Sequence, residues 1–196
     1  MKICLTVNSS PWSRFKGGGQ IAVHHLATAL SQKGHDVHVI YSKNPEEIID
    51  IKTDYTVHWA RHFNLATLNL NIFSFPGVLW GLASRERFEI IHGNSEEALF
   101  FSLIARVFRA RYVFTSHAPF IPKTGFWGGL LHPVFFLKRL NSYFLRSAAK
   151  GAQMIFTFSQ FSKNLVVEGL GPKFERRVHV VAPGINAEWF ESKRNP

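Results

Sequence analysis

Three consecutive glycines, Gly17 to Gly19, stand between the first predicted strand and the first predicted helix. Glycine lets the backbone approach a ligand closely, and the amides at a helix N-terminus favour an anion such as a diphosphate. A flexible loop that binds nothing would show the same glycines. The chain has no G-x-G-x-x-G and no Walker lysine, and Tyr41 to Lys43, which end the second predicted strand, lack the acid that binds ribose in NAD proteins. The sequence therefore disfavours a nicotinamide oxidoreductase and a P-loop protein.

His117 is the second residue that could do chemistry. It directly follows a strand predicted over residues 112–116, so we expect it at the carboxyl edge of a parallel sheet, beside the glycine loop. A histidine there could hydrogen-bond a sugar hydroxyl or stabilise developing charge. The chain has ten histidines, so a structural role stays open as well. No His/Cys/Asp cluster at ligand spacing and no Asp-x-Asp predicts a metal site.

Apolar segments alternate with segments of helical spacing along the chain. This alternation predicts βαβ units, and hence an α/β fold with a Rossmann-like parallel sheet and helices on both faces. The predicted strands cover residues 2–7, 37–41, 55–60, 89–92, 112–116, 154–158 and 178–181. The predicted helices cover residues 20–33, 95–108, 133–150 and 159–169. Residues 63–84, interrupted by Pro76-Gly77, are expected to be irregular or a kinked helix.

Serines mark two of the predicted helix starts. Ser95 is expected as an N-cap, with Glu96 and Glu97 in the first turn behind it, where acids complement the helix dipole. Ser159 is expected to cap the last helix.

Composition indicates one globular domain. The chain has 196 residues, of which 46% are hydrophobic and 18% charged, and it is long enough for a sizeable core. Its one cysteine, Cys4, excludes an internal disulfide and fits a reducing compartment. No apolar stretch is long enough to predict a membrane-spanning helix.

The net charge of +10 is unevenly distributed. Residues 98–167 contain nine cations and no acid, and residues 55–85 also lack acids. Aromatic residues interleaved with the cations favour an anionic partner such as a membrane surface, a phosphorylated substrate or nucleic acid, although a solubility role stays open. The sequence has no helix-turn-helix, RRM or zinc signature, so nucleic-acid binding rests on charge alone.

A basic amphipathic helix is predicted over residues 133–150. At about 100° per residue, Lys138, Arg139 and Arg146 share one arc that also contains Phe135, and Trp127 precedes the helix. These five residues are predicted to contact an anionic membrane. A solvated basic side above a buried apolar side would give the same pattern.

The last predicted strand leads into Ala182-Pro183-Gly184 and then into Trp189-Phe190. This pattern is typical of the hinge of a two-domain protein. We therefore expect residues 1–182 to form a Rossmann-like domain and residues 183–196 to begin an interdomain linker. A cleft enzyme with one wall would not complete its chemistry alone.

Six segments in this order resemble the N-terminal domain of retaining GT-B glycosyltransferases of family 4. No single segment is specific, but their order and spacing are, and only about residues 42–87 and 118–147 lack a match. The segments are residues 2–7 with the three glycines, 26–41 (LATALSQKGHDVHVIY), 88–94 (FEIIHGN), 112–117 (YVFTSH), 149–161 (AKGAQMIFTFSQF) and 178–190 (VHVVAPGINAEWF).

The resemblance implies that this domain holds the acceptor and that a separate C-terminal domain binds the nucleotide-sugar. Gly18 and Gly19 would approach the donor diphosphate, His117 would contact the transferred sugar, and Asn94 would be a further cleft residue. Ala118 stands where the family often has Gly or Asp, which loosens the acceptor contacts expected there. The resemblance also implies no metal and no cofactor besides the donor substrate, with the chemistry resting on stabilisation of the diphosphate.

Ser159 and Lys163, one turn further on, would lie near the same cleft by the resemblance. A structural role for both is the first interpretation.

The sequence therefore predicts the acceptor-binding half of a retaining glycosyltransferase, inactive without a donor-binding domain in cis or trans. Its expected partners are a nucleotide-sugar, an acceptor sugar or lipid, and an anionic membrane surface. The expected location is the cytoplasm, including the inner face of the membrane. The alternatives are a non-catalytic basic subunit that binds a membrane-bound anionic acceptor, and a nucleic-acid-binding protein.

Overall fold

The computed structural model describes residues 1–13, 17–44, 47–65, 68–117, 133–182 and 184. Within these residues, seven parallel strands form one sheet in the order β3-β2-β1-β6-β7-β8-β9. Each of the seven predicted strands overlaps one of them, so the predicted parallel α/β sheet is confirmed. The strands are β1 (Lys2–Val7), β2 (Asp36–Lys43), β3 (Thr56–Arg61), β6 (Ile90–Gly93), β7 (Arg111–Thr115), β8 (Met154–Thr157) and β9 (Val178–Val180).

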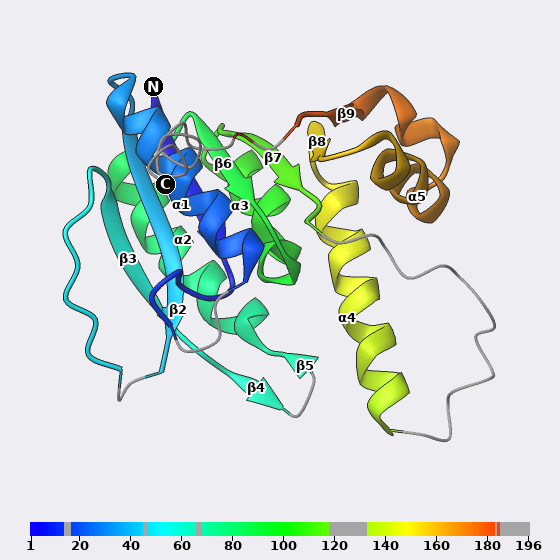
Figure 1. The fold of residues 1–196 in the computed structure, drawn as a ribbon, viewed down its shortest axis with the longest axis horizontal. Helices are drawn as coiled ribbons and strands as arrows, with labels where there is room; N and C mark the ends of the chain where they lie inside the picture. Colours follow the sequence, from blue (N-terminus) through cyan, green and yellow to red (C-terminus); the bar gives the residue numbers. More distant parts are fainter. Residues whose placement is uncertain (14–16, 45–46, 66–67, 118–132, 183, 185–196) are drawn as a thin grey trace, which may run out of the picture.

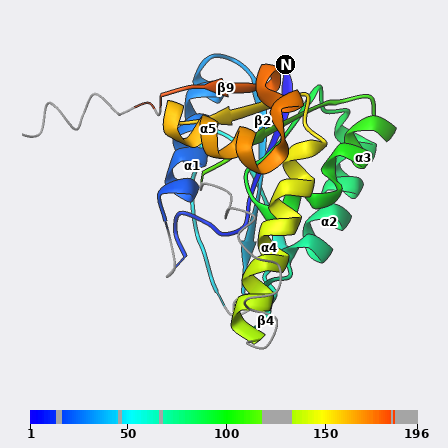
Figure 2. The ribbon, with the colours of Figure 1, turned by 90° about the vertical axis from the view of Figure 1, so that its right-hand side faces the viewer.

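Helices cover both faces of the sheet. On one face α1 (Gly18–Gln32) packs Val23 and Ala27 against β1 and β2. The other face carries α2 (Asn71–Glu86), α3 (Phe101–Val107), α4 (Pro133–Lys150) and α5 (Gln160–Leu170), all of which contribute to the larger core cluster. Figure 1 shows α1 in front of the sheet, with α2 and α3 behind it. In Figure 2, α2, α3 and α4 lie together on one side of the molecule.

The central strand β1 explains why the sheet needs two helical layers. Residues 3–7 are all buried, so both faces of this strand are removed from water. Leu5 pairs with Val39 of β2 on one side and with His92 of β6 on the other. Such a run without polar alternation is typical of a parallel strand covered on both faces.

Residues 63–84 are more regular than we predicted. They form a short hairpin, β4 (Asn64–Leu65) with β5 (Leu68–Asn69), followed by α2, which contains Pro76 in its interior. Proline removes one backbone hydrogen bond there. Burial of Phe75, Leu79 and Leu82, spaced at helical intervals, offsets that loss.

The two predicted serine caps differ. Ser159 caps α5, because its hydroxyl accepts a hydrogen bond from the Ser162 amide at 3.1 Å. The prediction for Ser95 is wrong in detail. A 3₁₀ segment, η1 (Glu96–Phe100), separates Ser95 from α3, and the Ser95 hydroxyl donates to Glu96 at 2.6 Å and caps no amide. The predicted helix over residues 95–108 is therefore two shorter elements.

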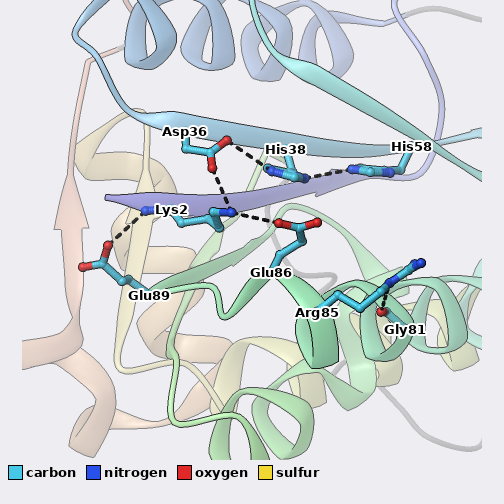
Figure 3. A network of polar contacts seen from close by, with 8 residues as sticks. All are labelled: Lys2, Asp36, His38, His58, Gly81, Arg85, Glu86 and Glu89. Carbon is cyan, nitrogen blue, oxygen red and sulfur yellow. Dashed lines mark hydrogen bonds and ion pairs between the residues drawn. The ribbon is translucent and has the colours of Figure 1, made fainter.

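A charged network fastens the amino edge of the sheet, as Figure 3 shows. The Lys2 ammonium lies 3.0 Å from Asp36 of β2 and 2.8 Å from Glu86 at the end of α2. Asp36 also contacts His38, whose ring stacks on His58 of β3. These contacts join three strands and α2 at the edge opposite the strand ends where ligands are expected.

Among the described residues, no helix has both the length and the apolar character needed to cross a bilayer.

We predict that Gly93→Ala destabilises the fold. A β-carbon on Gly93 would lie 2.4 Å from that of buried Ala98 and 3.2 Å from the Tyr112 hydroxyl, so the packing of η1 on β6 must shift. Urea unfolding should show a loss of about 1–3 kcal/mol. The matched control, Gly77→Ala in α2, meets no atom within 4 Å and should gain about 0.5–1 kcal/mol. Equal stability of the two variants would contradict the packing described.

Candidate functional site

The ends of β1, β6 and β7 meet the start of α1 at the carboxyl edge of the sheet. A β-carbon on Gly19 would lie 3.4 Å from both Cγ and Nδ1 of His117, so the glycine loop and this histidine are direct neighbours. Nothing would lie within 4 Å of a β-carbon on Gly18. The structure thus brings together the two features that the sequence singled out.

Asn94, in the turn after β6, holds the His117 ring. The Asn94 Oδ1 lies 2.9 Å from His117 Nε2, and Asn94 Nδ2 donates to the backbone carbonyl of Thr6 at 2.8 Å. Because the side-chain nitrogen of Asn94 donates to Thr6, the side-chain oxygen faces the histidine. This oxygen can only accept a hydrogen bond, so His117 Nε2 must carry a proton and donate it. This assigns the proton of His117 to Nε2 and leaves Nδ1, on the Gly19 side, as an acceptor.

The His117 ring is neutral at pH 7. Burial lowers its pKa to about 4, and the ring packs against Phe158 at 5.2 Å between centroids. Burial, with a smaller effect of His117, also lowers the pKa of neighbouring His92 to about 4. His92 contacts the Thr115 hydroxyl at 2.7 Å. At pH 7 the His117 ring is therefore available as an uncharged hydrogen-bonding group and not as a cation.

Glu97, in η1, lies beneath Asn94 and was not predicted as a site residue. Its Oε1 accepts a hydrogen bond from the Thr6 hydroxyl at 3.1 Å and another from the backbone N–H of Asn94 at 3.4 Å. Burial is the main cause that raises the pKa of Glu97 to about 8, so the carboxyl is mostly protonated at pH 7. The sequence carries only a weak signal for the contact between Thr6 and Glu97, namely a threonine inside an otherwise apolar strand.

Gln20 ties the glycine loop to the sheet. Its Oε1 accepts from the Gly17 amide at 2.9 Å, and its Nε2 donates to Asn8 Oδ1 at 3.1 Å. Asn8 Nδ2 in turn donates to the Ser95 hydroxyl at 3.4 Å. The first turn of α1 carries no acid, and the first amides of a helix have no partner within it. The arrangement favours an anion at this helix N-terminus.

A second polar cluster lies further along the same edge, where β1, β2 and β3 end. Ser42 donates to the Asn8 carbonyl and contacts His62 Nδ1 at 2.8 Å. Asn71, the first residue of α2, donates to the Asn8 carbonyl at 3.1 Å and accepts from the Phe63 amide at 2.9 Å. This cluster fixes the hairpin and the start of α2 beside the site, and sequence reasoning missed it.

The structure describes only some of the other residues predicted to belong to a site. Ser159 and Lys163 follow β8, whose end carries Phe158 to the His117 ring, and Lys163 is half-buried. Arg146 is half-buried, with its Nε enclosed. Trp127 and the side chains of Phe135, Lys138 and Arg139 lie outside the described residues, so membrane contact through these five stays a prediction. No group of metal-ligating side chains occurs in the part of the chain that the structure describes.

Comparison with known proteins indicates a family. The model described as Glycosyltransferase Family 4 matches residues 16–189. No curated protein matches the chain.

Solved structures share the fold at low sequence identity. HepE from Anabaena, in complex with UDP and glucose, is 15% identical with a TM-score of 0.60, over 95% of this chain and 45% of that one. A glycosyltransferase from Rickettsia africae is 17% identical with a TM-score of 0.61, over 100% of this chain and 46% of that one. The catalytic domain of starch synthase IV from Arabidopsis thaliana, bound to ADP and acarbose, is 14% identical with a TM-score of 0.65, over 100% of this chain and 54% of that one. The chain thus spans about half the length of these proteins, and the Rossmann-like half of a GT-B architecture is confirmed.

We predict that Glu97→Gln becomes progressively more stable than the wild type as the pH rises from about 4.5 to about 8. In that interval the unfolded wild type releases the Glu97 proton, whereas the folded state keeps it, so folding is disfavoured. Glutamine keeps an acceptor for Thr6 and Asn94 without carrying the proton. Urea unfolding over a pH series checks this, and a stability difference that stays constant with pH would contradict it.

We predict that nitrogen NMR of labelled histidine finds the His117 proton on Nε2. Asn94→Ala removes the acceptor, so the Nδ1-protonated form should become populated. The exposed His25 is the internal control, and its signals should be the same in both proteins. A proton on Nδ1 of His117 in the wild type would overturn the assignment.

Proposed function

The chain belongs to glycosyltransferase family 4, and we propose that it is the acceptor-side half of a retaining enzyme that moves a sugar from a nucleotide-sugar to an acceptor. The observation that carries this proposal is the close approach of Gly19, with room for no more than an added β-carbon, to the neutral His117 ring at the carboxyl edge of the sheet. An anion-binding helix start and an uncharged hydrogen-bonding ring side by side suit a ligand with a diphosphate next to a sugar.

His117 is proposed to accept a hydrogen bond from a hydroxyl of the transferred sugar through Nδ1. The Asn94 contact at 2.9 Å supports this role, because it occupies Nε2 and leaves Nδ1 as the acceptor. A neutral ring held in one orientation needs no rearrangement as charge develops on the sugar, and such preorganisation favours the transition state.

Gly18 and Gly19 are proposed to bring backbone amides to the donor diphosphate. The open space around a β-carbon on Gly18 supports an approach from that side. A nucleoside diphosphate is the proposed leaving group, and UDP or ADP in complexes of HepE and starch synthase IV supports that class of donor. No metal or further cofactor is proposed.

A second domain is proposed to supply the rest of the donor site, in cis or trans. This chain matches 45% of the length of HepE, which supports a division of the enzyme into two such halves. The chain alone would then transfer no sugar. Ser159 and Lys163 are proposed to face this second domain across the cleft, whereas buried Asn94 is proposed to act through the His117 ring that it orients.

We predict that a chimera of this chain with the part of HepE that it does not match transfers the glucosyl group of UDP-glucose to an acceptor or to water and releases UDP, and that the chain alone does not. In the chimera, His117→Ala should lower kcat by about 10²–10³, with a smaller effect on acceptor KM. Gly18→Val should keep the unfolding midpoint but lose UDP release, because the added side chain fills the space proposed for the diphosphate.

The control variant is His25→Ala, which removes an exposed histidine of α1 and should leave kcat unchanged. Turnover by the isolated chain would refute the need for a second domain. Unchanged turnover in His117→Ala would assign this histidine to structure alone.

A further inference from the structure

The outer face of the α2–α3–α4 layer carries large apolar side chains in contact with solvent. Six of them are between 43% and 69% exposed: Phe73 and Trp80 of α2, Phe100 of η1, Leu103 and Val107 of α3, and Tyr143 of α4. Trp80 packs edge-on against Phe108 at 5.0 Å, so the apolar surfaces of α2 and α3 are continuous. Both α2 and α4 contact η1, the element that carries Phe100. We call this set of six residues the outer apolar face.

Exposed cations border the outer apolar face where the three helices end. Arg85, Arg106 and Lys150 stand in the last turns of α2, α3 and α4, and Arg87 and Arg109 follow the first two helices. The ion pairs among the described residues involve Lys2 and His38, so none of these five cations is neutralised by a described acid. Arg85 donates a hydrogen bond from its Nε to the backbone carbonyl of Gly81 in the same helix (Figure 3).

The acids near the outer apolar face are already engaged. Glu86 is held by Lys2 at 2.8 Å, as Figure 3 shows, and Glu96 accepts from the Ser95 hydroxyl at 2.6 Å. Glu97 is fully buried beneath Asn94. Most of α2 comes from the acid-free residues 55–85, and α3 and α4 come from the acid-free residues 98–167. The fold packs α2 beside α3, and η1 contacts both α2 and α4.

We propose that the outer apolar face binds an anionic lipid bilayer. A surface of aromatic and aliphatic groups bordered by cations matches the interface of such a bilayer, where rings enter the headgroup region and cations meet lipid phosphates. A second copy of the chain fits poorly, because each copy carries a net charge of +10 and would present the same unneutralised cations. Lipid binding here requires neither a donor domain nor turnover, so it is tested separately from glycosyl transfer.

The test is co-sedimentation of the chain with vesicles of phosphatidylcholine alone or mixed with phosphatidylglycerol. Binding should require phosphatidylglycerol and weaken with salt. The double variant Trp80→Ser and Leu103→Ser should lose binding. The double variant Arg85→Ser and Arg106→Ser should bind about thirtyfold more weakly, since each cation near an anionic surface favours binding by about 1 kcal/mol.

Matched controls lie on other surfaces of the molecule. Ile21→Ser with Leu26→Ser removes two exposed apolar groups of α1, and Lys33→Ser with Arg176→Ser removes two exposed cations. Each variant is assayed below its own unfolding midpoint, because Trp80→Ser removes the ring contact with Phe108. Both control pairs should bind vesicles nearly as well as the wild type.

Several results would overturn the proposal. These are absence of binding to phosphatidylglycerol vesicles, equal binding to neutral vesicles, or full binding by the Trp80→Ser and Leu103→Ser variant, which would assign lipid contact to another segment. If sedimentation equilibrium shows a dimer of the wild type and a monomer of Trp80→Ser, the outer apolar face would be assigned to self-association instead.

Discussion

The side chain of Asn94 is the constraint on which the geometry of the carboxyl edge depends. Its amide nitrogen donates to the Thr6 carbonyl of β1, and its oxygen accepts from His117 after β7. The Asn94 backbone amide is held by Glu97 from below. One buried residue therefore links two strand ends and η1 through its side-chain oxygen, its side-chain nitrogen and its backbone N–H. Any change in the spacing of β1, β6 and β7 would break one of these bonds in a buried setting, where an unpaired polar group is costly.

The same burial sets the charge state of the site. Burial shifts the pKa of His92 and His117 downward, to about 4, and that of Glu97 upward, to about 8. The three groups are thus predominantly neutral at pH 7, although the chain as a whole carries a charge of +10. A neutral site neither repels an anionic ligand nor traps it as an ion pair would. In the proposed function, the backbone amides of Gly18 and Gly19 recognise the anion, and Gln20 holds the preceding residue, Gly17, against Asn8.

Features of the chain that depend on local pattern could be predicted from the sequence. Apolar segments at regular intervals gave the parallel sheet, and three glycines before a helix, with a histidine after a strand, gave the centre of the site. Glu97 lies in the first turn after Ser95, as predicted, but its hydrogen bond with Thr6 was missed because Thr6 is distant in sequence. Pro76 led us to expect an irregular segment or a kinked helix, and α2 is a helix that contains this proline, sustained by burial of Phe75 and Leu79. The Ser42–His62–Asn71 cluster joins the ends of β2 and β3 to the start of α2, which are separated in sequence, so no local pattern could reveal it.

Charged residues are used differently at the two edges of the sheet and on the helical layer. At the amino edge, Lys2 engages Asp36 and Glu86, and its backbone amide engages Glu89, so several of the few acids are used to fasten strands far from the site. At the carboxyl edge, Thr6, Asn94, Glu97 and His117 are joined by hydrogen bonds between neutral groups. The excess of cations is left on the helical layer, at helix C-termini where positive charge complements the dipole. Helix-end stability therefore explains why those positions are basic, but it does not explain why the apolar residues beside them are exposed. That combination is what distinguishes the α2–α3–α4 surface from α1, whose exposed Ile21 and Leu26 have no cation within the helix.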